Sequence, residues 1–321
     1  MPLPEALLCR LRLPLIAAPM FRVSGVELVL AACRAGVVGA FPTANCRSVA
    51  ELDAWLERLR DGLAQGADSS AMPAAPFCPN LIMRRDALHD ELQCLLRHRV
   101  ELVITSVGSP APVVGPLHDI GCTVLADVAS VRHAEKALEA GVDGLILLTA
   151  GAGGQTGWAN GFAFARAVRA FFDGPLVLAG GIGDGQALWA ARALGCDLAY
   201  MGTRFIATHE SLAQPVYKDM LAHSRLDDVL LTSAFTGLPT SMLRPAIVAS
   251  GLDPERLPTD LQAERAAELY GSGAAGPRRW TDIWSAGHSV SAVTGTCGVA
   301  ELVAQLQAEY DAARTASALL R

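Results

Sequence analysis

The sequence is poor in charged residues and contains no run of basic ones. Lys, Arg, Asp and Glu together make up 18% of the 321 residues, and the formal net charge is −6 at pH 7. Surfaces that bind nucleic acid through its phosphates need clustered Lys and Arg. The sequence therefore excludes DNA and RNA from the expected partners.

Long hydrophobic runs are also missing. No segment reaches about 18 uninterrupted apolar residues, the length typical of a membrane-spanning helix. Arg10 and Arg12 interrupt the apolar N-terminal stretch, and the core of a signal peptide does not contain such charges. We expect a soluble, cytoplasmic protein that does not contact a membrane.

Paired cysteines are a third absence. The chain has 8 cysteines, but none of them forms a C-x-x-C pair. Such pairs mark zinc sites and redox motifs, and disulfide frameworks belong mainly to small secreted domains. We therefore expect no metal and no disulfide, and we interpret the cysteines as reduced thiols that are mostly buried.

Apolar residues are abundant. They amount to 51% of the chain, which predicts a large core and argues against long disordered regions. Short apolar runs bounded by Gly or Pro recur along the chain, and such nearly continuous runs are typical of parallel strands covered on both faces. We predict eight strands, at residues 13–20, 37–43, 75–82, 101–108, 122–128, 144–151, 175–182 and 197–205.

Helical segments with recognisable ends separate these runs. Capping-box spacing occurs at two helix starts, Ser24 with Glu27 and Ser48 with Glu51. Single capping side chains precede two more helices, at Ser130 and Asp184. Glycines suited to a left-handed helix stop follow three helical stretches, at Gly36, Gly141 and Gly195.

Eight strand–helix units in succession favour a (β/α)8 TIM barrel, a single domain of roughly 250 residues. An open doubly wound sheet commonly begins with a Gly-rich turn after its first strand, and none follows Met20. Residues 209–280 exceed what one barrel helix needs, so we predict an inserted helical cap after strand eight. The predicted division is a TIM barrel at 1–208, the cap at 209–280, and a C-terminal return at 281–321 with a helix over 298–318.

Glycines stand at the ends of strands seven and eight, where TIM barrels often hold phosphate. Strand seven ends in Gly180 and Gly181, and strand eight ends in Gly202 and Thr203. Bare backbone N–H groups with a hydroxyl suit a phosphate dianion. These loops predict a phosphate site, although strand-end glycines also serve steric packing.

The other strand ends offer a different surface. Met20 and Asn80 follow strands one and three, Asp127 ends strand five, and residues 149–160 read TAGAGGQTGWAN around Gln155. Apolar contacts, one amide, one carboxylate and a nearly side-chain-free segment suit a planar heteroaromatic ring. The alternative interpretation of GAGG is a tight turn.

Five short motifs in this order resemble the nitronate monooxygenase group, once called 2-nitropropane dioxygenases: APM, Asn80, GAGG-Q-x-G, AGGI and MGTRF. The match spans most of residues 13–206. The resemblance implies an FMN-dependent barrel with a cap, which oxidises alkyl nitronates with molecular oxygen (O2) to carbonyl compounds and nitrite. It also implies FMN contacts at Met20, Asn80, Gly153, Gly181, Tyr200, Met201, Gly202 and Thr203, with the phosphate on the last five.

Gln155 departs from this pattern, because the best-characterised members have histidine there. An amide cannot accept a proton near neutral pH, so the chain should prefer the anionic nitronate over the neutral nitroalkane. His288, on the segment returning from the cap, is a candidate substitute base, and a solvent-facing loop histidine is the alternative. Leu148 also departs, since many relatives have a glutamine there that faces the flavin.

Several alternatives stay open at this point. The barrel can be an FMN-dependent enoyl-thioester reductase that uses NAD(P)H, or a flavin-binding protein without turnover. A non-redox lyase or synthase is disfavoured by the lack of a catalytic lysine or paired carboxylates at strand ends. Asp127 is either a cofactor or substrate contact or a structural carboxylate, and the apolar cap leaves a homodimer open.

Overall fold

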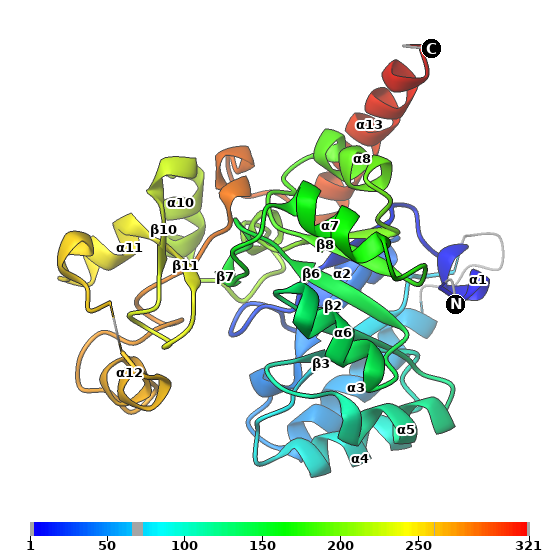
Figure 1. The fold of residues 1–321 in the computed structure, drawn as a ribbon, viewed down its shortest axis with the longest axis horizontal. Coiled ribbons are helices and arrows are strands. Elements are labelled where there is room, and N and C mark those ends of the chain that lie inside the picture. The colour runs from blue at the N-terminus through cyan, green and yellow to red at the C-terminus, as the bar shows by residue number, and fades with distance from the viewer. Residues whose placement is uncertain (1–2, 66–72, 260, 320–321) are drawn as a thin grey trace.

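Eight parallel strands close into a barrel in the computed structural model, which describes residues 3–65, 73–259 and 261–319 (Figure 1). The strands follow one another in chain order, and the last pairs with the first, with Leu15 opposite Ala199. Each strand lies within a predicted run, so the predicted TIM barrel is confirmed. The bounds are β1 Leu15–Ala17, β2 Val38–Pro42, β3 Phe77–Ile82, β4 Leu102–Ser106, β5 Thr123–Val128, β6 Gly144–Leu148, β8 Leu176–Ala179 and β9 Leu198–Met201.

Helices surround this barrel. The outer helices are α2 Val26–Arg34, α3 Val49–Ala64, α4 Leu88–Arg97, α5 Ala111–Asp119, α6 Val131–Glu139, α7 Gly161–Arg169, α8 Gly185–Ala193 and α13 Val299–Ala318. The C-terminal helix α13 packs against α8 and α2, which completes the ring as the sequence predicted. The short helix α1, Glu5–Leu8, contributes Leu7 to the cluster inside the barrel.

The core has two layers because strand residues alternate between them. Ile104 belongs to the cluster inside the barrel, whereas Val103 belongs to the larger cluster between the strands and the helices. Both side chains are fully buried. This arrangement explains why the strands read as continuous apolar runs.

Three of the four predicted helix caps are confirmed. The side chains of Ser48, Ser130 and Asp184 each accept a backbone N–H of the helix that follows. The prediction for Ser24 is wrong, because Gly25 is the N-cap and the helix start has no side-chain cap. Ser24 Oγ instead accepts the N–H of Met20 at 3.0 Å and donates to the Ala18 carbonyl at 3.3 Å.

The three predicted helix stops are also confirmed by left-handed backbone angles. Their φ values are +86° at Gly36, +91° at Gly141 and +95° at Gly195. An L residue with a side chain rarely adopts this conformation.

The insertion after the barrel contains strands as well as the predicted helices. Its elements are α10 Pro215–His223, β10 Val229–Thr232, β11 Thr240–Leu243, α11 Arg244–Ala249 and α12 Ala263–Tyr270, with single 3-10 turns at Leu226–Asp228 and Pro254–Arg256. The strand pair was not predicted. Figure 1 shows the insertion, in yellow and orange, beside one end of the barrel. Nothing observed tests the proposed boundaries at 208 and 280, which stay a prediction.

A two-residue strand connects the insertion to the barrel. Strand β7, Gly154–Gln155, lies in the loop after β6 and pairs antiparallel with β11, with Gln155 opposite Thr240. The predicted eighth strand is also shorter than expected, because Thr203–Ile206 forms a short helix, α9. Both features lie at the carboxyl end of the barrel.

Two further expectations concern the whole chain. All 8 cysteines are free, and 6 of them are buried. Among the described residues, no helix has the length and apolar character needed to cross a membrane.

Candidate functional site

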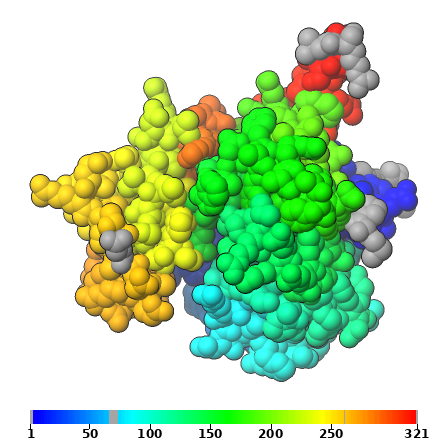
Figure 2. Space-filling model, viewed as in Figure 1, coloured from blue at the N-terminus to red at the C-terminus, as the bar shows by residue number. Residues whose placement is uncertain are grey.

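A cavity of about 2120 Å³ lies at the carboxyl ends of the barrel strands. Loops after β1, β3, β5, β6, β8 and β9 form one wall, and the other includes Trp280, the last residue of the predicted cap, and Trp284 of the return segment. Figure 2 shows the insertion and the barrel side by side, and the cavity lies between them. TIM barrels carry their chemistry at this end of the strands.

The loop after β8 leaves room for a ligand beside one glycine. Gly181 has φ +75°, and a Cβ built on it would meet no described atom within 4 Å. Gly180 has φ +119°, but a Cβ there would collide with Thr149 Oγ1. Gly180 is therefore required by protein packing, whereas the space beside Gly181 is open to the cavity.

Thr203 stands across from this loop, at the end of β9. Its buried hydroxyl oxygen accepts the N–H of Gly287 at 2.9 Å, and a hydroxyl that accepts one bond can still donate its proton. The neighbouring Arg204 is buried and donates from Nη1 to the Gly183 carbonyl at 2.8 Å. The Thr203 hydroxyl and the Arg204 guanidinium thus tie together the loops after β8 and β9 and the return segment.

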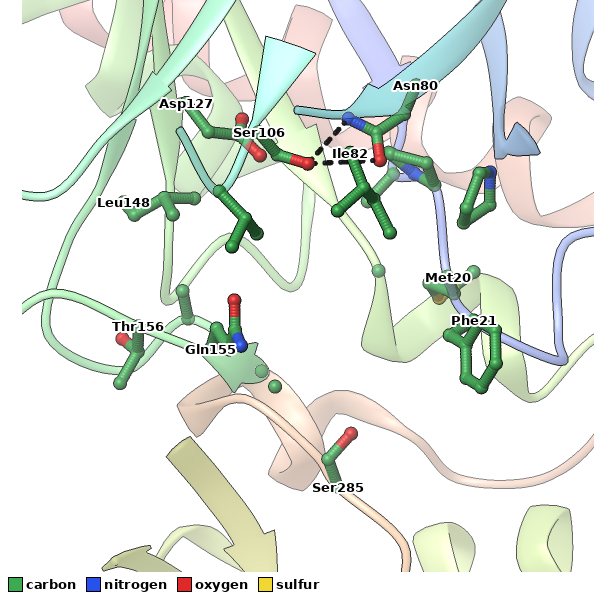
Figure 3. A pocket seen from close by; sticks show the side chains of 18 of the residues that line it. Met20, Phe21, Asn80, Ile82, Ser106, Asp127, Leu148, Gln155, Thr156 and Ser285 are labelled. Atoms are coloured by element: carbon green, nitrogen blue, oxygen red, sulfur yellow. Dashed lines mark hydrogen bonds between the residues drawn. The ribbon is translucent and has the colours of Figure 1, made fainter. Parts of the chain in front are cut away.

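Asn80 and Ser106 form a polar pair on the opposite side of the cavity (Figure 3). Asn80 Nδ2 donates to Ser106 Oγ at 3.1 Å and to the Ile104 carbonyl at 3.3 Å. Asn80 is 5% exposed, so its amide has a fixed orientation at the barrel mouth. Met20 lies nearby, and its carbonyl accepts Asn45 Nδ2 at 3.1 Å.

The glycine run after β6 is packed mainly by protein rather than left bare. A Cβ on Gly153 would meet Gly287 N at 2.8 Å, and one on Gly151 would meet the His288 ring at 2.6 Å. Gly154 is freer, with its nearest neighbour, Trp280, at 3.9 Å. Close approach of the return segment therefore explains most of this run, and only part of it faces the cavity.

Gln155 projects from β7 into the cavity, toward the barrel mouth (Figure 3). Its backbone is held by the pairing of β7 with β11. The residue is exposed. The backbone position of Gln155 is therefore fixed, and its side-chain amide is free to contact a ligand.

Asp127 faces the cavity from β5 and lacks the partners that buried carboxylates usually have. Its Oδ1 atom is buried without a hydrogen-bond partner among the described residues. Burial raises the pKa of the Asp127 carboxyl to about 7. Tyr200, which lies across the barrel on β9, has a pKa raised well above its ordinary value, chiefly by burial and secondly by the Asp127 charge.

The predicted cofactor contacts come together, with one exception. Met20, Asn80, Asp127, Gly153, Gly180, Gly181, Tyr200, Gly202 and Thr203 all line the cavity. Met201 does not, because its side chain is buried in the layer between strands and helices. Alternation along β9 places Met201 outside when Tyr200 points in, so a side-chain contact for Met201 is ruled out.

His288 does not reach the cavity either. Its backbone N–H donates to the Gly151 carbonyl at 2.9 Å, and its side chain is exposed and lies outside the cavity lining. The substitute-base hypothesis for His288 is therefore corrected to the alternative of a solvent-facing loop histidine.

Sequence reasoning missed the charged rim of the cavity. The basic lining residues are Arg22, Arg47, Arg84, Arg85, Lys136 and Arg279, and the acidic ones are Glu51, Asp127 and Glu139. This excess of positive charge contrasts with the net charge of −6 for the chain. No signal in the sequence brings these residues together, because they come from loops and helices that are far apart along the chain.

Comparisons with known proteins agree with this architecture. The profile of the nitronate monooxygenase family matches residues 79–309. The chain is 25% identical to the nitronate monooxygenase of Paraburkholderia phytofirmans over 92% of both chains. The solved structure of nitroalkane oxidase from Streptomyces ansochromogenes superposes with a TM-score of 0.80 and 26% identity, and the match covers 97% of this chain and 99% of that one.

Another relative has a different activity. The chain is 27% identical to "(3aS,4S,5R,7aS)-5-hydroxy-7a-methyl-1-oxo-octahydro-1H-indene-4-carboxyl-CoA dehydrogenase" of Mycobacterium tuberculosis, over 73% of this chain and 64% of that protein. The chain thus spans less than two thirds of that relative's length.

The family profile covers most of β3, the five barrel strands after it, the insertion and the first half of α13, which together make up well over half of the chain. Its members named above are oxidoreductases, and the cavity described here lies where their fold carries its chemistry. The chain belongs to the nitronate monooxygenase family.

Proposed function

We propose that the cavity binds FMN, with the phosphate at the loops after β8 and β9 and the ring toward β3 and β5. Three features support the fit: the open space beside Gly181, the Thr203 hydroxyl, and the orphaned oxygen of Asp127. Backbone and hydroxyl donors suit a phosphate, and an unpaired buried carboxyl is accounted for if a ligand atom meets it.

The proposed reaction is the oxidation of anionic alkyl nitronates with O2 to carbonyl compounds and nitrite. The observation that carries it is the placement of Gln155, which projects into the cavity from a strand held by its pairing with β11. When bound, the flavin accepts electrons from the substrate and passes them to O2. Gln155 donates a hydrogen bond to a nitronate oxygen and orients the anion, and it removes no proton.

The basic rim supports an anionic substrate. Arg47, Arg84 and Lys136 border the cavity, and a cleft with an excess of one sign of charge raises the local concentration of the opposite charge. A nitronate already carries the charge that a neutral nitroalkane gains only by losing a proton. The site therefore favours the nitronate without needing a general base.

The test begins with the absorbance of the purified protein. Flavin bands in the visible range, and FMN released on denaturation, are expected. Anaerobic mixing with a simple alkyl nitronate should then bleach the visible band, and admission of air should yield nitrite. The parent nitroalkane at the same concentration is the matched control and should react far more slowly. No visible band after reconstitution with FMN would refute the cofactor assignment.

A second candidate is oxidation or reduction of a coenzyme A thioester. The cavity volume of about 2120 Å³ favours it, because it exceeds the roughly 300–1,000 Å³ typical of sites for drug-sized ligands. The arginine rim also suits the phosphates of such a substrate. The carboxyl-CoA dehydrogenase relative is consistent with this activity.

The two candidates give opposite results in one pair of assays. A thioester enzyme consumes NADH or NADPH with a crotonyl-type thioester and forms no nitrite from nitronates. A nitronate oxidase forms nitrite without a nicotinamide cofactor. Measuring both reactions on the same FMN-loaded preparation therefore decides between them.

A further inference from the structure

Asp127 and Glu91 are two carboxyl groups shielded from solvent that differ in their hydrogen-bond and ion-pair partners. Glu91 is 3% exposed and meets Arg85 at 3.1 Å and the Thr43 hydroxyl at 2.7 Å. Asp127 has a buried oxygen, Oδ1, for which no described residue provides a donor. Glu91 therefore has both a cation and a hydroxyl donor as partners. Among the described residues, Asp127 Oδ1 has neither.

The groups that face Asp127 do not favour its ionised form. Tyr200 from β9 and Cys78 from β3 become negative on ionisation, and burial raises the pKa of both well above their ordinary values. The neighbouring strands β4 and β6 contribute Ser106 and Leu148, which carry no charge. Helix α6, which packs outside β5, contributes three titratable residues to the border of the cavity: His133, Lys136 and Glu139.

The neutral carboxyl group has a capacity that its anion lacks. A protonated carboxyl carries an O–H donor, whereas a carboxylate only accepts. Burial without a cation raises the pKa of Asp127 to about 7, so much of the group is protonated near neutral pH. A buried carboxylic acid can be kept neutral to donate a hydrogen bond in an apolar site.

We propose that Asp127 is a neutral hydrogen-bond donor to an acceptor atom of the flavin ring, and that its ionisation weakens cofactor binding. This inference rests on the proposed function, since it requires FMN in the cavity. It assigns Asp127 as a cofactor-positioning residue, and the titration of this carboxyl is separate from that of the FMN phosphate, whose second pKa is about 6. Gln155 would then contact the substrate or the flavin from the wall of the cavity that faces the barrel mouth.

The experiment measures the dissociation constant of FMN for the apoprotein from flavin fluorescence, at about pH 6 and about pH 8, on either side of the Asp127 pKa of about 7. The wild type should bind about threefold to tenfold more weakly at the higher pH, the range expected for loss of one hydrogen bond. Asp127→Asn keeps a donor without the charge and should bind tightly at both values. Asp127→Ala should bind weakly at both.

Controls separate this effect from other titrations. Riboflavin lacks the phosphate group, so its binding should show the same pH dependence if Asp127 is the cause. Asp184→Asn makes the same chemical change outside the cavity and should retain the wild-type pH dependence, since asparagine also caps helices.

The outcomes distinguish the two proposals. Riboflavin binding that is equal at both pH values in the wild type, or an Asp127→Asn protein that binds as weakly as Asp127→Ala, overturns the donor role alone. Failure of the wild type to bind FMN at either pH overturns the cofactor assignment and this inference with it.

Discussion

The two ends of the cavity differ in the kind of polar group that they present to a ligand. Around Gly181 and Thr203 a ligand would meet backbone and a hydroxyl, and side-chain bonds from Arg204 to the Gly183 carbonyl and from the Gly287 N–H to Thr203 fix the loops. Around Asn80, Asp127 and Gln155 the polar groups are side chains that project from separate strands (Figure 3). The first end is determined by backbone geometry, the second by side-chain chemistry.

This difference has a functional consequence. A loop that binds through backbone N–H groups can keep its ligand while the side chains around it change. The end built from side chains can change its reaction by a single substitution, and Gln155 is such a position. The predictions below perturb one end at a time, and each specifies what should happen at the other.

Replacing Gln155 by histidine should have the largest effect, at the side-chain end. The new imidazole supplies a general base, and such groups typically contribute 10²–10⁴ in rate. We therefore expect nitrite formation from neutral nitroalkanes to rise by about a hundredfold or more, with a pH profile that follows the imidazole. Steady-state assays of nitrite from paired nitroalkane and nitronate substrates measure the change.

The matched variant is Gln155→Glu, whose carboxylate is isosteric but should repel an anionic nitronate. FMN affinity should stay unchanged in the histidine variant, because the phosphate end is untouched. Equal nitroalkane rates in the wild type and the histidine variant would mean that Gln155 does not limit proton removal.

Gly181→Val should abolish the binding function of the phosphate end. Valine at φ +75° is strained, and its side chain would enter the open space beside the loop. Loss of charge-assisted hydrogen bonds to phosphate predicts FMN binding weaker by about a hundredfold. Fluorescence titration with FMN and riboflavin measures it.

The wild type should prefer FMN strongly over riboflavin, and the valine variant should lose that preference. Gly251→Val is the control, because Gly251 has φ +82° and open surroundings but lies outside the cavity. A Gly181→Val protein that still prefers FMN would place the phosphate elsewhere.

The barrel and the phosphate end follow from sequence because their signals are local. Apolar runs located all eight strands, and paired glycines after β8 located the loop at Gly181. The strands β10 and β11 were not located, because they pair antiparallel with each other inside an insertion that departs from the repeating strand–helix pattern. Ser24 shows that a capping motif fails when its hydroxyl bonds elsewhere, here to the backbone of Met20 and Ala18 in the preceding loop.

The side-chain end was only partly predictable, because its chemistry depends on what lies opposite. Sequence placed Asp127 at a strand end but could not show that its Oδ1 lacks a partner. The position of His288 depended on the path of the return segment over Gly151. Contacts between distant segments have no local pattern, so these outcomes required the structure.

Asp127→Asn should change the pH dependence of stability in the apoprotein. The carboxyl has an ordinary pKa of 3.8 and a folded-state pKa of about 7, so burial costs nothing below pH 3.8 and its full amount above about 7. Wild-type stability should fall across that window by about 2 kcal/mol relative to the variant. This is less than the about 4 kcal/mol of a three-unit shift, because the residue borders an open cavity.

Urea unfolding at about pH 5 and about pH 8 measures the difference, with Asp184→Asn as the control for a carboxyl outside the cavity. The two variants should diverge mainly at the higher pH. Parallel pH profiles for the wild type and Asp127→Asn would show that Asp127 titrates in its ordinary range.

Thr203→Val should produce the smallest effect, at the phosphate end. Valine keeps the shape of threonine but removes the hydroxyl that accepts the Gly287 N–H and is proposed to donate to phosphate. FMN binding should weaken by about tenfold, and the unpaired N–H should destabilise the fold by about 1 kcal/mol. Thr203→Ser restores the hydroxyl and should recover both losses. Thr208→Val removes a buried hydroxyl that donates to Phe205 outside the cavity, so it should lower stability without changing FMN affinity. If Thr203→Val bound FMN as tightly as Thr208→Val, the hydroxyl would serve only to anchor the return segment, and backbone groups alone would account for the phosphate end.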